Sequence, residues 1–132
     1  MRKELDEQLC KKYPEIFKNR YGSLGETAMC WGFECGGGWY NIIDAACATI
    51  KNHEYNHKFN NREFNPVVAT QVKEKYGTLR FYYAGGDDYV DGVIAMAEHI
   101  SAFTCETCGS PGKVREGAWI RTLCDEHAKE YE

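Results

Sequence analysis

Proline is scarce in this sequence, with three residues in 132, and no proline-rich or low-complexity stretch interrupts it. The chain also has no apolar run near the roughly 20 residues that a membrane-spanning helix needs. Its first residues, MRKELDEQLCKKYPEIF, are charged where a secretion signal is apolar. Basic residues are not in excess, since the formal net charge is -4. These absences argue against a membrane protein and against a general polyanion binder, so we expect a protein of the cytosol.

Cysteine, in contrast, is plentiful. Seven cysteines, an odd number, in a chain without a secretion signal fit reduced thiols and metal ligation better than a disulfide framework. Hydrophobic residues make up 43% and aromatic residues 14% of the chain, which is too much for a disordered protein. The length suits one compact domain that folds throughout.

Apolar spacing predicts three helices. Residues 3–12 place Leu5 and Leu9 one turn apart, and a second helix is expected to begin at Trp39, after the glycine turn at residues 36–38. We expect this helix to fray into a surface loop over the polar, Asn-rich residues 51–66. Asp87 and Asp88 provide the cap and first-turn charge of a third helix. Its apolar stripe consists of Tyr89, Val93, Met96, Ala97 and Ile100.

Two segments predict β-structure. The apolar run CWGF at residues 30–33 favours a short strand. The segment VVATQVKEKYGTLRFYYAGG alternates in polarity and is rich in β-branched and aromatic residues on both sides of Tyr76-Gly77-Thr78, which predicts a β-hairpin. The fold class is therefore α+β, with helices packed on a small antiparallel sheet or hairpin.

The most specific chemical pattern is CETCGSPGKVREGAWIRTLCDEH, close to the end of the chain. Cys105 and Cys108 are two residues apart, as are Cys124 and His127, and fifteen residues separate the two pairs. This spacing is close to that of zinc sites, where short arms bring soft or borderline ligands to one tetrahedral ion. The segment between the pairs can turn at Glu116-Gly117 as a hairpin, and CDEHAKEYE begins a final helix.

This order of knuckle, hairpin and helix resembles a treble-clef zinc finger. The resemblance implies one structural Zn²⁺ bound by Cys105, Cys108, Cys124 and His127. We expect residues 104–132 to form this module and to dock on an α+β core of residues 1–103, so that the chain is one compact unit. Four protein ligands leave no position for water or substrate, which argues against catalytic zinc.

A second metal pattern is weaker. Cys30 and Cys35, followed by His53 and His57, read as Cys-x4-Cys and His-x3-His, and the two histidines would share a helix face if the helix continued that far. Seventeen residues lie between the pairs, and they include the glycine turn and an apolar helix. The favoured alternative is buried free cysteines and exposed loop histidines.

Nothing in the sequence indicates an enzyme. No nucleophile motif, phosphate-binding loop or open metal site is present. Cys47 is most simply a small buried residue on a helix, and no activating histidine accompanies it or Cys10 in the sequence. We expect a protein without catalytic activity.

A nucleic-acid or nucleotide-signal binding site is one alternative function. The segment QVKEKYGTLRFYY interleaves basic and aromatic residues that could neutralise phosphates and stack on bases. These candidates are Lys73, Lys75, Tyr76, Arg80 and Tyr82. A half-buried hairpin with a basic outer face produces the same pattern for packing reasons, and we prefer that interpretation. The zinc module adds little support for nucleic-acid binding, because it contains four basic and six acidic residues.

Three segments together, CWGFECGGGWY, VKEKYGTLRFYY and the terminal CETCG with WIRTLCDEH, resemble a family of small uncharacterised proteins from bacteriophages and prophages. The resemblance implies a setting in the cytosol of an infected bacterium. Small phage accessory proteins often bind and block host machinery, so we expect a host protein as partner, and an inhibitor of an antiviral defence system as one form of this function. Candidate contact residues are Trp31, Trp39, Tyr40 and Trp119, although a place in the core is the favoured interpretation for each of them. The sequence leaves the oligomeric state open.

Overall fold

The β-hairpin is the centre of the fold. A computed structural model describes residues 1–131, and in it strands β2 (Val68–Lys75) and β3 (Thr78–Ala84) pair antiparallel. Tyr76 and Gly77 form the two-residue turn with φ angles of 53° and 83°, the left-handed conformation that a type I′ turn requires at both positions. The predicted hairpin is confirmed.

The sheet is mixed where the sequence predicted an antiparallel one. A short strand β1 (Phe33–Glu34) pairs in parallel with β2, which gives the strand order β1-β2-β3. The predicted strand at residues 30–33 was wrong for its first half, since Ala28–Trp31 form a 3₁₀ helix whose first turn is capped by the Thr27 side chain. Gly32, with a φ of 74°, then turns the chain into β1.

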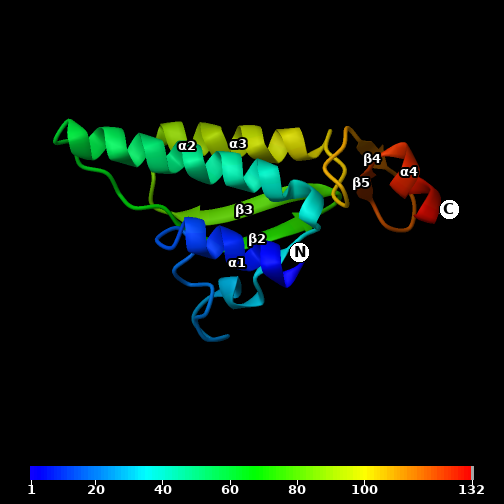
Figure 1. The fold of residues 1–132 in the computed structure, drawn as a ribbon, viewed down its shortest axis with the longest axis horizontal. Helices are drawn as coiled ribbons and strands as arrows, with labels where there is room; N and C mark the ends of the chain where they lie inside the picture. Colours follow the sequence, from blue (N-terminus) through cyan, green and yellow to red (C-terminus); the bar gives the residue numbers. More distant parts are fainter. Residues whose placement is uncertain (132) are drawn as a thin grey trace.

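Helices cover the sheet and its edge (Figure 1). Helices α2 (Tyr40–Phe59) and α3 (Asp88–Ser101) pack side by side, and α1 (Lys3–Lys12) packs on the core through Leu9. The free edge of β3 is closed by α3, because Ser101 Oγ and Glu98 Oε2 accept hydrogen bonds from the backbone N–H groups of Leu79 and Phe81, at 2.9 and 2.8 Å. Such closure protects an edge strand from pairing with other chains.

Helix α2 is longer than the sequence predicted. It continues through His53 and His57 to Phe59, where a loop was expected, and Asn61, just beyond its C-cap Asn60, has a φ of 53°. The N–H groups of Asn61 and Arg62 bond to the carbonyls of Lys58 and His57, at 3.1 and 2.8 Å, which is the Schellman arrangement. These polar residues are helical because the end of α2 packs on other elements. The polarity of the segment by itself does not show that packing.

The predicted apolar stripe of α3 faces outward. Its core side consists of Val90, Ile94, Ala97 and Ser101, whereas Tyr89, Met96 and Ile100 of the predicted stripe are exposed. Only Ala97 belongs to both sets. Helix α3 therefore has two apolar faces, and the core uses one of them.

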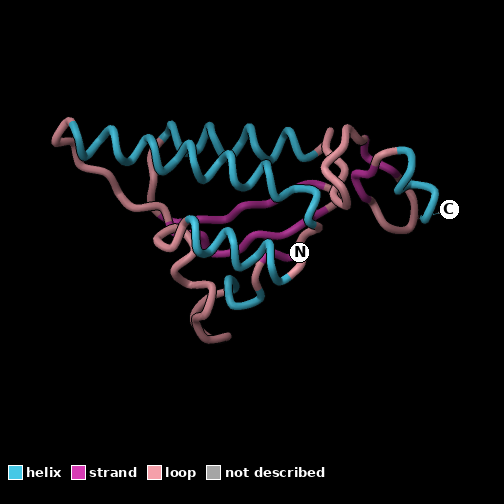
Figure 2. The backbone as a smooth tube through the Cα atoms, in the orientation of Figure 1, coloured by secondary structure: helices cyan, strands magenta, loops and turns pink. Residues whose placement is uncertain are grey.

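The C-terminal segment forms a small module at one end of the molecule (Figures 1 and 2). It contains the hairpin of β4 (Lys113–Arg115) and β5 (Arg121–Leu123), the short helix α4 (Asp125–Ala128) and a 3₁₀ turn over Lys129–Tyr131. Glu132, the last residue of the predicted module, lies outside the described residues.

Several hydrogen bonds join this module to the rest of the chain, and two of them involve side chains of Trp39 and Thr122. Trp39 Nε1 donates to the carbonyl of Thr104 at 2.9 Å, and Thr122 Oγ1 donates to the carbonyl of Gly77 at 2.6 Å. The start of α2 and the β2–β3 turn are therefore both fixed to it. Over residues 1–131, none of the helices has both the length and the apolar character needed to cross a membrane.

Candidate metal centre

The first pair of predicted ligands lies on a tight loop that follows α3 (Figure 2). Cys105 is buried, its carbonyl accepts a hydrogen bond from the Gly109 N–H at 2.8 Å, and Gly109 has a φ of 83°. This left-handed glycine closes the loop and brings Cys108 back beside Cys105. The geometry is a knuckle of the kind that Cys-x-x-Cys arms form around a metal.

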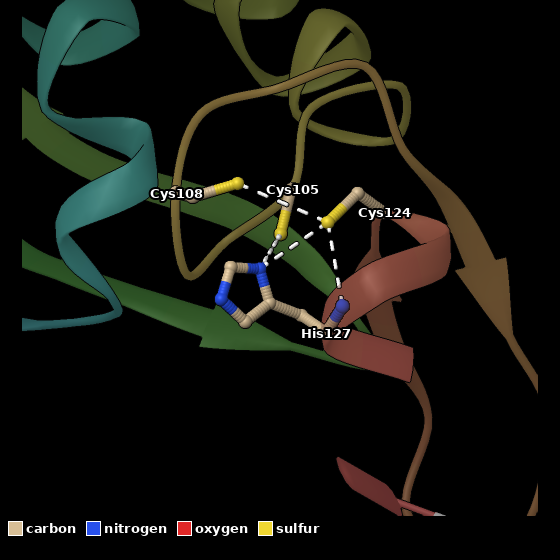
Figure 3. Close-up of side chains that lie close together, drawn as sticks. All are labelled: Cys105, Cys108, Cys124 and His127. Atoms are coloured by element: carbon tan, nitrogen blue, oxygen red, sulfur yellow. Dashed lines mark hydrogen bonds between the residues drawn. The ribbon is translucent and has the colours of Figure 1, made fainter. Parts of the chain in front are cut away.

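The second pair lies at the start of α4. Cys124 is the N-cap residue of this helix, and its Sγ accepts a hydrogen bond from the His127 N–H at 3.5 Å. The cap position places Cys124 and His127 on the same side of the first turn, facing the knuckle (Figure 3). The same two-residue spacing therefore occurs in two different local structures, a knuckle for the first pair and the first turn of a helix for the second. Both direct their side chains toward one point.

The four side chains converge with the dimensions of a tetrahedral site. Their ligand atoms all lie within 4.8 Å of one another. Cys108 Sγ is 3.9 Å from Cys124 Sγ, and His127 Nδ1 is 3.6 Å from Cys105 Sγ and 3.2 Å from Cys124 Sγ. An ion with ordinary zinc bond lengths would separate two sulfurs by about 3.8 Å and a sulfur and a nitrogen by about 3.5 Å. The cluster can hold a metal ion, with His127 binding through Nδ1.

Local hydrogen bonds and burial shift the pKa values of the three thiols in different directions. Burial raises the pKa of Cys105, but backbone hydrogen bonds from Cys124, Cys108 and Thr107 outweigh it and lower the pKa to about 6. The Ser110 side chain lowers the pKa of Cys108. The backbone hydrogen bond from His127 lowers the pKa of Cys124, but burial and the neighbouring thiols together outweigh it, and the pKa is raised. The lowered pKa of Cys105 favours the thiolate form, which is the form that binds a metal.

Glu106 anchors the knuckle from beneath. It is buried, its backbone N–H bonds to the Thr122 carbonyl at 3.0 Å, and its Oε2 accepts from the Gly36 N–H at 2.8 Å. Its Oε1 lies 3.5 Å from an Arg121 guanidinium nitrogen, so the buried carboxylate has a cation beside it. Sequence reasoning missed this residue, since a glutamate between two cysteines reads as surface charge.

The second predicted metal set does not form among residues 1–131. His53 and His57 lie together on α2, but their third neighbour is Asp87, the N-cap of α3, and neither Cys30 nor Cys35 joins them. Burial, reinforced by the charge of Glu106, raises the pKa of the Cys35 thiol to about 12, so this thiol stays protonated. The prediction was wrong in its two cysteines. Sequence spacing does not show which distant segment packs beside the histidines of α2, and that segment contains Asp87.

The predicted basic and aromatic residues lie on the outer face of the hairpin. Lys73 stands opposite Arg80, and Lys75 and Tyr82 line the same hollow as Lys73, with a volume of about 560 Å³. Tyr76 is exposed at the turn. Two cations of the C-terminal module are paired instead, since Arg115 bonds to Asp125 at 2.8 Å and Arg121 lies beside Glu106. Arg115 and Arg121 of the module therefore do not extend the basic residues of the sheet.

The four candidate aromatic contacts divide into two groups. Trp31 and Trp119 are 63% and 68% exposed, so both are available to a partner. Trp39 is fully buried in the core and cannot be a contact, which corrects its assignment. Tyr40 is half-buried, and its hydroxyl donates to Gln8 at 3.2 Å. Trp31 and Trp39 each end a 3₁₀ helix and still differ completely in exposure, so local structure alone does not decide it.

A groove between α2 and α3 was not predicted. It has a volume of about 760 Å³ and is lined chiefly by apolar or small side chains, among them Ile42, Ala45, Gly92, Val93 and Met96. The predicted stripe of α3 was the available signal, because all of its residues line this groove and only Ala97 among them is also buried in the core.

Comparison with known proteins gives no relative. No protein-family model, curated protein or solved structure matches the chain. The likeness to phage and prophage proteins stays a prediction, and the site has to be interpreted from its own geometry.

Proposed function

We propose that the Cys3His cluster holds one structural Zn²⁺ and that the chain is a non-catalytic protein-binding module. Three thiolates and one imidazole are donors that zinc prefers in structural sites, and the interatomic distances support a tetrahedral arrangement. Four protein ligands leave no open position, so this ion stabilises the fold and does not polarise a substrate. The sequence of knuckle, hairpin and short helix supports a treble-clef description of the module.

The exposed groove between α2 and α3 carries the protein-binding proposal. Met96, which lines it, is 66% exposed, and Tyr89 and Ile100 on the same helix are also exposed. Exposing an apolar stripe of this length has a cost in water, since each large apolar side chain gains about 1.5 to 3 kcal/mol on burial. An apolar surface that the core does not use is typical of an interaction site.

The dimensions favour the apolar face of a partner helix as the occupant. The groove follows α3, whose 14 residues span about 21 Å, a length of nearly four helical turns. Ala45 and Gly92 form small positions in its wall, and no atom lies within 4 Å of where a Gly92 Cβ would be. A second helix can therefore approach closely, as in other helix-in-groove complexes. Among the described residues that line the groove, Asp88 is the one with a charge, so a basic residue at one end of the partner helix would complement it.

Within this proposal, the partner is a protein of a host bacterium, and inhibition of an antiviral defence protein is its most specific form. The support for this setting is the resemblance to phage and prophage proteins and nothing in the site itself. Trp31 and Trp119, both exposed, could extend the contact beyond the groove.

The experiment compares Met96→Glu with Phe59→Glu. Phe59 is an exposed aromatic residue at the end of α2 that does not line the groove, so it is a matched control. A host protein retained by the wild-type chain would be purified and its Kd measured by calorimetry. We expect Met96→Glu to weaken binding at least about 30-fold, as at an interface hot spot, and Phe59→Glu to leave it unchanged. Equal binding by both variants would contradict the groove as the interface.

A second candidate function is binding of single-stranded nucleic acid or a nucleotide on the outer face of the sheet. Lys73, Lys75 and Tyr82 meet at one polar hollow, and Arg80 Nε, across from Lys73, is buried without a hydrogen-bond partner in the described residues. Glu26 also lines this hollow, and its charge opposes an anionic ligand.

Salt dependence separates the two candidates. If the second is correct, fluorescence anisotropy with a labelled oligonucleotide or nucleotide should show binding that weakens steeply between 50 and about 200 mM salt and is lost in Lys75→Ala. Met96→Glu would leave that binding unchanged. Binding to a purified protein that tolerates salt and is lost in Met96→Glu would support the groove instead.

A further inference from the structure

A second set of potential metal ligands lies at the far end of α2 from the Cys3His cluster. His53 and His57 are one helical turn apart on α2, and Asp87 faces them from the start of α3. One nitrogen or oxygen of each side chain lies within 4.8 Å of the others. His53 Nε2 is 2.7 Å from Asp87 Oδ2, and His57 Nε2 is 3.9 Å from the same oxygen.

The ring of His57 is oriented by the backbone. Its Nδ1 lies 3.1 Å from the carbonyl oxygen of His53. A carbonyl can only accept a hydrogen bond, so Nδ1 carries the proton, and in the neutral ring Nε2 then has a free lone pair directed toward Asp87. Metal-binding histidines in proteins are oriented in the same way, with the second ring nitrogen donating to a carbonyl or carboxylate.

The other two side chains are held as firmly. Asp87 Oδ1 accepts a hydrogen bond from the Val90 N–H at 3.0 Å as the N-cap of α3, which leaves Oδ2 for the histidines. The ring of His53 stacks on Tyr89 at a centroid distance of 4.0 Å, and Phe64 packs against the edge of His53 and beside His57. Each of the three groups is thus fixed by a contact that does not use its inward-facing atom.

We propose that His53, His57 and Asp87 form a second site, for a divalent transition metal ion of the zinc class. A tetrahedral ion with bonds near 2.05 Å separates its nitrogen and oxygen ligands by about 3.4 Å, between the two distances that Asp87 Oδ2 makes. Changes of less than about 1 Å in these two distances would bring both to that value, and the ion then takes the place of the proton between His53 and Asp87. Two imidazoles select zinc, cobalt or nickel over magnesium or calcium, which prefer oxygen ligands.

This site differs from the Cys3His cluster in being open. Three protein ligands leave at least one coordination position, and the side chains remain between 16% and 35% exposed, so water or an acidic or imidazole group of a bound molecule can reach the ion. The α2–α3 groove ends nearby, since Tyr89 lines the groove and stacks on His53. The proposal does not depend on the function assigned to that groove.

The test uses the full chain with one metal ion already bound, verified by native mass spectrometry. Co²⁺ is then titrated and followed by calorimetry and by absorption. We expect one further Co²⁺ per chain, with visible bands but no added sulfur-to-metal charge-transfer absorption, because the new site contains no thiolate. His57→Gln should weaken this second binding more than about 100-fold, beyond the loss typical of removing an outer-shell partner.

Two further variants keep the test independent of folding. Asp87→Asn retains a good N-cap while removing the carboxylate, so it should preserve the helix and lose the second ion. His99→Gln alters an exposed histidine outside the cluster and should bind two ions like the wild type. The proposal is overturned if the wild type binds one ion only, or if the second ion binds equally well in His57→Gln and Asp87→Asn.

Discussion

Glycine 38 shows how a single residue fixes the metal module to the core. Its N–H donates to the Glu106 carbonyl at 2.8 Å, and a Cβ at this position would lie 2.1 Å from the carbonyl oxygen of Cys105. Gly36 and Gly38 thus let the start of α2 reach the backbone of the knuckle, since a Cβ at Gly36 would lie 2.3 Å from the Glu106 carbonyl oxygen. The sequence predicted a turn at these glycines but not this close approach of two backbones.

We expect Gly38→Ala to destabilise the chain by about 1 to 3 kcal/mol, as other overpacking substitutions do, and to weaken metal binding by displacing Cys105. Urea unfolding and competition with a chelator measure the two effects. Gly25→Ala is the control, because no atom lies within 4 Å of its Cβ position. If both variants had the same stability and the same metal affinity, the close contact between Gly38 and Cys105 would not control either property.

Cys124 is the ligand with the clearest prediction. Cys124→Ala removes one of four ligands and the sulfur that accepts the His127 N–H. We expect loss of the bound metal by native mass spectrometry and faster amide exchange in β5 and α4, because structural metal binding is coupled to folding. Cys10→Ala, outside the cluster, should keep its metal. A fully folded, metal-bound Cys124→Ala would show that the ligand assignment is incorrect.

At the scale of elements, α1 is held to the start of the sheet by a buried ion pair. Asp6 Oδ1 accepts from Arg20 Nε at 2.9 Å, and Asp6 Oδ2 accepts from the Phe33 N–H at 3.3 Å. The Asp6 side chain is 10% exposed. One carboxylate therefore joins the helix, the following loop and β1, and its removal leaves the Arg20 charge without its partner.

Asp6→Ala should lower the free energy of unfolding by about 3 kcal/mol, in the range for breaking one side of a buried pair. Glu7→Ala, on the same helix, removes an exposed pair with Lys3 and should cost less than about 0.5 kcal/mol. Denaturant titration of both variants gives the difference. Equal effects would mean that the Asp6 pair is not coupled to folding.

Helix α3 contains a glycine in its interior. A glycine there lowers the stability of the helix, which suggests that it has a role in binding. Gly92 lies in the middle of the helix with open space at its Cβ position. Gly92→Ala should raise the free energy of unfolding by about 0.8 to 1 kcal/mol, measured by urea titration, because alanine is the better helix former. If a partner helix packs against this position, the same change should weaken binding. A more stable variant with unchanged binding would exclude Gly92 from the interface.

On the scale of the whole molecule, the main core and the metal cluster occupy different parts of the chain. The residues of the main core cluster lie between Leu9 and Ala97, whereas the four ligands lie beyond residue 104. Few hydrogen bonds connect the two parts, through Gly36, Gly38, Trp39 and Gly77. Metal loss should therefore act unevenly over the molecule.

Chelation at neutral pH should raise amide exchange over residues 104–131 while Val72 and Phe81 of the hairpin stay protected. Acid should act in the same direction, since protons compete with the metal for thiolates and imidazole, so affinity falls as pH falls. The low pKa of Cys105, about 6, means that this thiol resists protonation until mildly acidic pH. Exchange that rises uniformly over the chain would show that the core depends on the metal.

The sequence by itself determined what depends on near neighbours along the chain. The Cys-x-x-Cys and Cys-x-x-His arms, the hairpin turn at Tyr76-Gly77 and the Asp87 cap of α3 are each set within a few residues, so their patterns predicted them. Tertiary structure decided the rest. It extended α2 to Phe59, turned the predicted stripe of α3 toward a groove and brought His53 and His57 to Asp87. These outcomes depend on contacts between distant segments, and apolar spacing shows that a helix has an apolar face without showing what will cover it.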